Sequence, residues 1–190
     1  MITRRLAIWA LATGAMTSLT ACGAGLPGTS EAQKDTDRAG LRAAANVTLD
    51  QLIASQPEAA TVISEAQALL IFPEIIKGGL IVGAAGGDGV WQAGGVTQGY
   101  YRSTSVSYGL QAGVTSFGYV MAFMDQASID YVQNSDGWEV GVGPVVTVAD
   151  EGFAKKFTTT TINEGVVVFF VDQGGLFAGA GIEGTNITRL

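Results

Sequence analysis

The stretch KGGLIVGAAGGDGV, residues 77–90, has the residue types of a phosphate-binding loop: six glycines, one lysine and one aspartate in fourteen positions. A Walker loop closes with glycine, lysine and a hydroxyl residue, but here Lys77 precedes the glycines and no hydroxyl follows. A dinucleotide fingerprint needs a third glycine after Gly87 and Gly89 and then a helix, whereas the following residues favour a strand. We therefore expect a tight glycine corner between two strands. Such a corner serves the packing of a second backbone or the approach of a ligand, and the sequence leaves both open.

Acidic side chains near glycine-rich corners are the second group that could do chemistry. They are Asp88, Asp136, Asp172 and Glu183. Two carboxylates can act as acid and base, as in glycoside hydrolysis, but aspartate is also a common turn residue. The chain has no histidine, which excludes Ser-His and Cys-His catalysis, and the sequence shows no metal-ligand spacing. We expect a protein that is not an enzyme and carries no cofactor or metal.

Charge and composition narrow the class of partner. The chain has 17 acidic and 10 basic residues, a net charge of −7; without Arg4 and Arg5, which lie in the export signal described next, 8 bases against 17 acids give −9. Such a surface repels nucleic-acid phosphates and is not held on an anionic membrane by bulk charge. Hydrophobic residues make up 47% of the sequence, and 27 of its 190 residues are glycine. This composition favours a sheet with many turns over a helical bundle.

The amino terminus has the pattern of a lipoprotein export signal. Two arginines precede an apolar stretch at 6–19 that is too short to span a bilayer. The segment ends in Leu-Thr-Ala-Cys, which resembles a bacterial lipobox with Cys22 as the lipidated residue. We expect residues 1–21 to be a signal peptide and 22–31 a flexible tether, with the mature protein exported and anchored at the cell envelope, on the outer membrane facing the periplasm. The alternative is an ordinary signal cleavage that leaves an incidental cysteine.

Two helices are expected ahead of the sheet. Residues 32–55 have apolar side chains at helical spacing: Leu41, Ala45, Leu49, Leu52 and Ile53. A second helix is predicted to begin at a cap on Ser55 or Gln56 and to end at Pro73. Its apolar face would consist of Val62, Ile63, Ala66, Leu69 and Leu70. Core packing explains both stripes, and the alternative is that part of the first helix lies on a membrane.

After residue 78, short apolar or alternating runs separated by glycine predict antiparallel strands. The runs are 79–84, 90–93, 98–108, 110–114, 117–124, 138–148, 165–171 and 176–182. Residues 127–133 are predicted to form a short helix, and 135–137 and 172–175 to form turns. We therefore expect one α+β domain over 32–190, with N-terminal helices packed on a strongly curved, mostly antiparallel β-sheet or barrel-like sheet.

Five motifs occur in order along the chain: IFPEIIKGGLIVGAAGGDGV at 71–90, YYRSTSVSYGLQAG at 100–113, VMAFM at 120–124, NSDGWEVGVG at 134–143 and GGLFAGAGIEGTNI at 174–187. Together they resemble the SYLF domain family, also known as the Las17-binding actin-regulator domain, over residues 45–190. The resemblance implies a lipid-binding module, with phosphoinositides and other phospholipids as ligands, that bacteria export or lipidate. Some eukaryotic members also bind actin filaments. A bacterial envelope protein meets no actin, so we do not expect that partner.

Lipid contacts are assigned to the glycine corner and the strand that follows it. The candidates are Lys77, Gly78, Gly79, Trp91, Tyr100, Tyr101 and Arg102. Either cation could pair with a lipid phosphate, but Lys77 is also explained by solvation or a salt bridge, and Arg102 by a cross-strand ion pair. The aromatic residues, Trp138 among them, either rim a pocket or pack in the core. Lys155 and Lys156 are expected in an exposed loop.

The sequence therefore leaves three functions open. The leading hypothesis is a non-catalytic phospholipid-binding lipoprotein of the cell envelope. The first alternative is a structural or protein-interaction lipoprotein that binds another envelope protein. The second alternative is a hydrolase acting on envelope lipid or glycan through the carboxylates named above.

Overall fold

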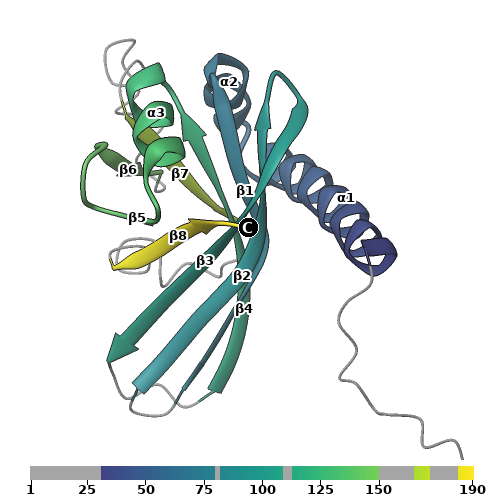
Figure 1. Ribbon diagram of the computed structural model, residues 1–190. Coiled ribbons are helices and arrows are strands. Elements are labelled where there is room, and N and C mark those ends of the chain that lie inside the picture. Colours follow the sequence, from purple (N-terminus) through teal and green to yellow (C-terminus); the bar gives the residue numbers. More distant parts are fainter. Residues whose placement is uncertain (1–30, 80–81, 109–112, 150–164, 172–183) are drawn as a thin grey trace, which may run out of the picture.

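The computed structural model describes residues 31–79, 82–108, 113–149, 165–171 and 184–190. These residues form three helices and an eight-stranded sheet that curls into a half-barrel (Figure 1). The first helix packs on the sheet, and all but one of the strand pairs are antiparallel. The predicted α+β fold class is confirmed.

Four long strands form the middle of the sheet and shorter strands flank them, in the order β5-β8-β3-β2-β1-β4-β7-β6. The bounds are β1 Ala68–Gly79, β2 Val82–Ala93, β3 Val96–Tyr108, β4 Gly113–Phe123, β5 Trp138–Glu139, β6 Val146–Val148, β7 Val166–Val171 and β8 Thr185–Arg189. Only β6 and β7 run parallel. The two edge strands of the described sheet are very short, which limits pairing with other chains.

Each face of the sheet contributes side chains to a buried core, since side chains alternate between the faces along each strand. The outer face packs against α1 (Glu31–Ser55) and α2 (Ala59–Glu65); its core includes Ala45, Leu52, Val62, Ile71, Val90, Val120 and Phe169. The inner face packs against α3 (Gln126–Asn134) and the β5 region; its core includes Leu70, Phe72, Trp91, Tyr101, Tyr119, Phe123 and Trp138. Figure 1 shows α1 along one side of the sheet and α3 on the opposite side.

The first helix has the predicted extent, and its stripe packs on the outer face as core. Leu41, Ala45, Leu49 and Leu52 all join that core, whereas Ile53, predicted on the same stripe, is exposed. Residues 33–40 are exposed throughout and contain no apolar side chain larger than alanine. The idea that part of this helix lies on a membrane therefore gains no support. Among the described helices, none is long and apolar enough to cross a membrane.

The second helix is shorter than predicted at both ends. The Ser55 hydroxyl donates to the carbonyl oxygens of Gln51 and Leu52, so it belongs to the end of α1 and caps nothing. Glu58 is the N-cap of α2 and makes no side-chain capping bond. The predicted extension to Pro73 is wrong, because β1 begins at Ala68. A short apolar run such as ALLIF fits a buried strand as well as a buried helix, and periodicity alone does not separate them.

The predicted glycine corner is wrong, because Gly83, Gly86, Gly87 and Gly89 all lie inside β2, which runs unbroken over Val82–Ala93. Gly87 and Gly89 allow close packing against β1, which is one of the two explanations left open by the sequence. Pro73 lies in the middle of β1, where it donates no hydrogen bond. The strand accommodates it with a bulge: between Ile71 and Ile76, five steps along β1 pair with four along β2.

Glycines on both neighbouring strands make room for this bulge. A Cβ atom on Gly87 of β2 would lie 2.1 Å from the carbonyl oxygen of Glu74, and one on Gly118 of β4 would lie 2.9 Å from that of Pro73. A Cβ on Gly89 would lie 2.6 Å from the Phe72 ring. The bulge and its flanking glycines thus form one structural unit, because a side chain at Gly87 or Gly118 would overlap the bulged backbone of β1.

The remaining element predictions were partly right. Predicted strands 98–108 and 165–171 correspond to β3 and β7, and the helix at 127–133 corresponds to α3. The described part of the run at 110–114 and the run at 117–124 belong to the single strand β4, which ends at Phe123. The run at 138–148 holds only β5 and β6, at its two ends. β8 was not predicted. The predicted strand at 176–182 and turn at 172–175 lie outside the described residues, while 135–137 forms the bend after α3.

Candidate functional site

Three of the aromatic candidates are core residues and are not available to a ligand at the surface. Trp91 is 1% exposed, Tyr101 and Trp138 are also buried, and all three belong to the inner-face core. Trp91 packs against Tyr101 and Phe123, with ring centroids 5.5 and 4.7 Å apart. Burial raises the pKa of Tyr101. The pocket-rim interpretation of Trp91 and Tyr101 is therefore wrong and the core interpretation is confirmed.

Tyr100, the neighbouring residue, points to the outer face and holds α1. Arg42 Nη1 donates to the Tyr100 hydroxyl at 3.0 Å, and the guanidinium carbon of Arg38 lies 5.0 Å from the centre of the Tyr100 ring. A cation over an aromatic face at this distance is attracted to it. Tyr100 therefore links the first half of α1 to β3, and its side chain already contacts Arg38 and Arg42.

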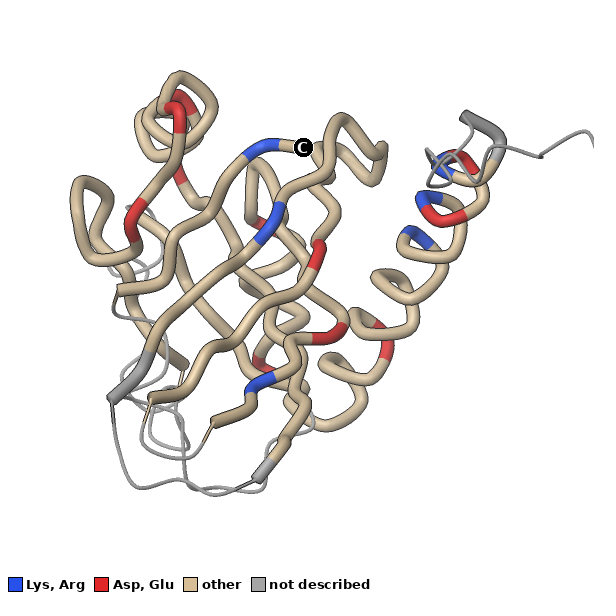
Figure 2. Tube along the Cα trace, turned by 60° about the horizontal axis from the view of Figure 1, so that its bottom comes forward, with Lys and Arg blue, Asp and Glu red and all other residues tan. Residues whose placement is uncertain are grey.

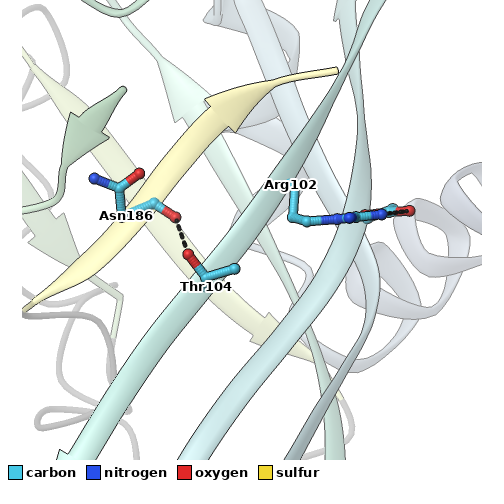
Figure 3. Close-up of polar contacts among 4 residues, drawn as sticks. Arg102, Thr104 and Asn186 are labelled. Carbon is cyan, nitrogen blue, oxygen red and sulfur yellow. Dashed lines mark hydrogen bonds and ion pairs between the residues drawn. The ribbon is translucent and has the colours of Figure 1, made fainter. Parts of the chain in front are cut away.

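Arg102 forms a two-pronged ion pair with Asp88 on the adjacent strand. Arg102 Nε lies 2.6 Å from Asp88 Oδ1 and Nη2 lies 2.9 Å from Oδ2, and the two residues are register partners of β3 and β2. Figure 3 shows the Arg102 side chain extending from β3 across β2, near the Thr104 hydroxyl that donates to the Asn186 carbonyl oxygen. The hydrogen bond and charge of Asp88 raise the pKa of Arg102. The cross-strand alternative for Arg102 is thus confirmed.

The other predicted lipid contacts lie at the far end of β1. Lys77, Gly78 and Gly79 pair with both β2 and β4, so their backbones are part of the sheet interior. Lys77 pairs with Ala85, which packs on the inner core, and so it points to the inner side, whereas Gly78 faces outward. Lys155 and Lys156 lie outside the described residues.

An uncovered apolar surface lies on the outer face, beyond the part that α1 covers. Its members Ile76, Val82, Val106 and Val114 are 54, 51, 71 and 76% exposed. One row of register partners crosses β4, β1, β2 and β3, and it consists of Val114, Gly78, Ala84 and Val106. Ile76 lies in the next row. We call this surface, defined by Ile76, Val82, Ala84, Val106 and Val114, the open apolar face.

The open apolar face differs from the rest of this acidic protein in having almost no charge. Sequence positions 78–87 and 103–124 contain no charged residue, and Lys77 is the only one from 75 to 87. In Figure 2 the charged residues gather on α1 and near α3, and the long strands are mostly uncharged. Glycine and alanine in the middle of the row keep the face flat. A flat, uncharged apolar patch is typical of a surface that contacts another apolar phase.

A groove of about 800 Å³ adjoins the open apolar face, between α1 and the bulged part of β1. Its apolar lining comes from Leu41, Ala44, Val47, Pro73, Ile76, Gly86 and Gly87. Its charged lining comes from Asp37, Arg38, Glu74 and Asp88. Ile76 belongs to both the groove and the open apolar face, so the two form one continuous surface. The bulge at Pro73 positions the Glu74 segment along the groove.

The carboxylates considered for catalysis do not come together within the described residues. Asp88 lies on the outer face in its ion pair with Arg102, whereas Asp136 follows α3, which packs on the inner face. Asp172 and Glu183 lie outside the described residues. The part of the chain that the structure describes contains no group of three or more His, Cys, Asp or Glu placed to hold a metal ion.

No protein-family model matches this chain, and no curated protein matches it significantly. The open apolar face was not predicted from the sequence, although a signal was present. Its strand residues fall within charge-free runs, and Val106 and Val114 are each flanked by glycine, serine or threonine.

Proposed function

We propose that this protein is a non-catalytic lipid-binding protein of the cell envelope, exported and anchored through lipid on Cys22. The open apolar face carries the proposal: four large apolar side chains are exposed together, on sequence segments (75–87 and 103–124) that contain no acidic residue. The motif resemblance to the SYLF family points to the same class of ligand. The domain would place this face against a bilayer, while the anchor keeps it within reach.

The strength of this contact follows from the side chains involved. Full burial of a valine or isoleucine contributes about 1.5–3 kcal/mol. Because the four residues are already partly covered, their transfer into lipid contributes about 1 kcal/mol each, or about 4 kcal/mol together. Before the costs of association, this equals a dissociation constant of about 1 mM. The open apolar face is thus a weak membrane contact that depends on the anchor for its effect.

Flotation with vesicles at about millimolar lipid tests the proposal, since this matches the affinity estimated above. The protein is the chain from residue 23 onward, which keeps the whole described fold and lacks the anchor. We expect wild type to float partially, and Val106→Asp with Val114→Asp to reduce binding at least about tenfold, because each change removes an apolar contact and adds a charge at the bilayer.

The matched control is Val96→Asp. Val96 is 64% exposed and lies on the same strand, but at its opposite end. We expect this variant to float like wild type, and thermal unfolding checks that all variants are folded. If wild type floats with no vesicle, neutral or acidic, the proposal is wrong. Equal losses from Val96→Asp and the double variant would mean that the open apolar face is not the contact.

A protein-interaction role is the second candidate, and a different surface favours it. Tyr131, Val142 and Val145 are exposed around the connection from β5 to β6. Tyr131 packs directly on Gly143, whose φ of +92° and lack of a side chain allow the ring to approach. Crosslinking in cells that traps one dominant envelope protein through this surface would favour this role over lipid binding.

A further inference from the structure

The groove beside α1 contains two charged groups of opposite sign that are not paired with each other. Glu74 is exposed and makes no hydrogen bond or ion pair within the described part of the chain. Arg38 stacks on the Tyr100 ring, and its N–H donors have no acceptor among the described residues. One group comes from β1 and the other from α1, so they line the groove from opposite sides.

One of the other two carboxylates of the groove is neutralised. Asp88 accepts two hydrogen bonds from Arg102, at 2.6 and 2.9 Å. Asp37 accepts from the neutral side-chain amide of Gln33 at 3.2 Å and keeps its charge beside Arg38 on α1. A ligand in this groove therefore meets the guanidinium of Arg38 on the α1 side and the carboxylate of Glu74 on the β1 side, beside an apolar wall.

We infer that the groove binds the head group of a zwitterionic phospholipid, one that carries both a phosphate and an ammonium. The phosphate would accept hydrogen bonds from Arg38, since guanidinium groups suit phosphate oxygens, and the ammonium would pair with Glu74. The acyl chains would leave along Val47 and Ile76 onto the open apolar face. This inference rests on the proposed function and names the lipid class for the same surface.

Charge complementarity separates this class from the alternatives. An anionic head group without an ammonium would satisfy Arg38 but leave Glu74 facing a net negative charge. A cationic amphiphile would satisfy Glu74 and repel Arg38. Only a head group with both charges matches both residues, so the groove should distinguish lipids that carry identical acyl chains.

Short-chain lipids below their micelle concentration test the inference on the chain from residue 23 onward. The probes are dihexanoyl phosphatidylethanolamine, dihexanoyl phosphatidylglycerol and free phosphoethanolamine, with binding followed by backbone amide shifts. We expect the ethanolamine lipid to bind about threefold to fivefold tighter than the glycerol lipid, the size of one partly exposed charge pair. The shifts should gather on α1 and around 73–88.

Two substitutions assign the preference to the groove. Glu74→Gln should make the two lipids bind equally, and Arg38→Gln should weaken both. Glu139→Gln, an exposed residue of β5, is the control and should change neither. Equal affinities in wild type, or a preference unchanged by Glu74→Gln, would overturn the inference. Free phosphoethanolamine binding as tightly as the lipid would also overturn it, because the acyl contacts would then contribute nothing.

The test separates failure of this inference from failure of the proposed function. Val106→Asp with Val114→Asp should reduce vesicle binding at least about tenfold yet retain the head-group preference, because neither residue lines the groove. Flotation that depends on the open apolar face, together with no head-group preference, would leave the proposed function standing and remove the groove as a lipid site.

Discussion

At the scale of single residues, the Asp125 side chain joins two parts of the fold that are far apart in sequence. It is the N-cap of α3, where its carboxylate accepts from the Ser128 backbone amide at 2.7 Å and from the Ser128 hydroxyl at 2.9 Å. It also accepts from the backbone amide of Gly165, which directly precedes β7. Burial alone would raise the pKa of Asp125, but these hydrogen bonds lower it overall. The residue thus links α3 to the start of β7.

We predict that Asp125→Ala lowers the free energy of unfolding by about 1–2 kcal/mol at pH 7, the usual cost of losing a capping side chain. Because the folded pKa lies below the ordinary value of 3.8, the carboxylate's contribution is complete above that pH. It is lost as the pH falls from there through the folded pKa. Urea unfolding at pH 7 and pH 3 should therefore show a smaller difference between wild type and variant at pH 3.

The control for Asp125 is Asp130→Asn on the same helix, where the carboxylate accepts only from the exposed side chain of Gln126. This change should alter stability by less than about 0.5 kcal/mol. A loss from Asp125→Ala that is the same at both pH values would show that the ionised carboxylate is not what stabilises this junction.

At the scale of elements, the bulge in β1 decides how the middle of the sheet is built. Pro73 removes a ladder hydrogen bond, and the extra residue of β1 that absorbs this defect brings the Pro73–Glu74 backbone close to both neighbouring strands. Gly87 and Gly118 are the positions where it approaches most closely. The glycine at position 87 is therefore explained by a backbone defect in the neighbouring strand.

We predict that Gly87→Ala lowers the free energy of unfolding by about 1–3 kcal/mol, because its Cβ would overlap the Glu74 carbonyl oxygen and force the bulge to shift. Gly40→Ala is the matched control: it lies in α1 with nothing within 4 Å of an added Cβ. That change should stabilise by about 0.5–1 kcal/mol through helix propensity. Urea unfolding of the three proteins measures both effects. A neutral Gly87→Ala would mean that the bulge does not need this glycine.

These elements also show what the sequence could reveal and what it could not. The α1 stripe, β3, β7 and α3 were predictable because long or clearly alternating patterns specify one periodicity. The β1 start was not, because ALLIF is apolar at every position and fits either element. The need for glycine at 87 was not predictable either, since it comes from Pro73 on another strand. The lipid-contact candidates failed at Trp91 and Tyr101 for a related reason: sequence does not tell which face of a two-sided sheet is covered.

At the scale of the whole molecule, lipid anchor and domain act together in the proposed function. The open apolar face alone corresponds to a dissociation constant of about 1 mM at best, because the costs of association weaken it further, and this cannot hold a freely diffusing protein on a membrane. A short flexible tether raises the effective local concentration of the domain to the millimolar range. An anchored domain would then be docked for at most about half of the time. Small changes in the open apolar face would therefore shift its position at the membrane without releasing it.

We predict this partial docking for the acylated protein in vesicles. A fluorophore on Ser116→Cys, an exposed residue in the same row as Ile76, reports contact through lipid-borne quenchers. Partial quenching, at most about half of the maximum, is expected in the otherwise unchanged protein. Less than about a tenth of the maximum is expected after Val106→Asp with Val114→Asp, since two lost contacts weaken docking at least tenfold. Val96→Asp should leave quenching unchanged.

Both variants should stay with the vesicles, because acyl chains on Cys22 hold them there, whereas Cys22→Ala should release the protein. Quenching that survives the double substitution would mean that another surface faces the bilayer, and retention of Cys22→Ala would mean that the anchor lies elsewhere.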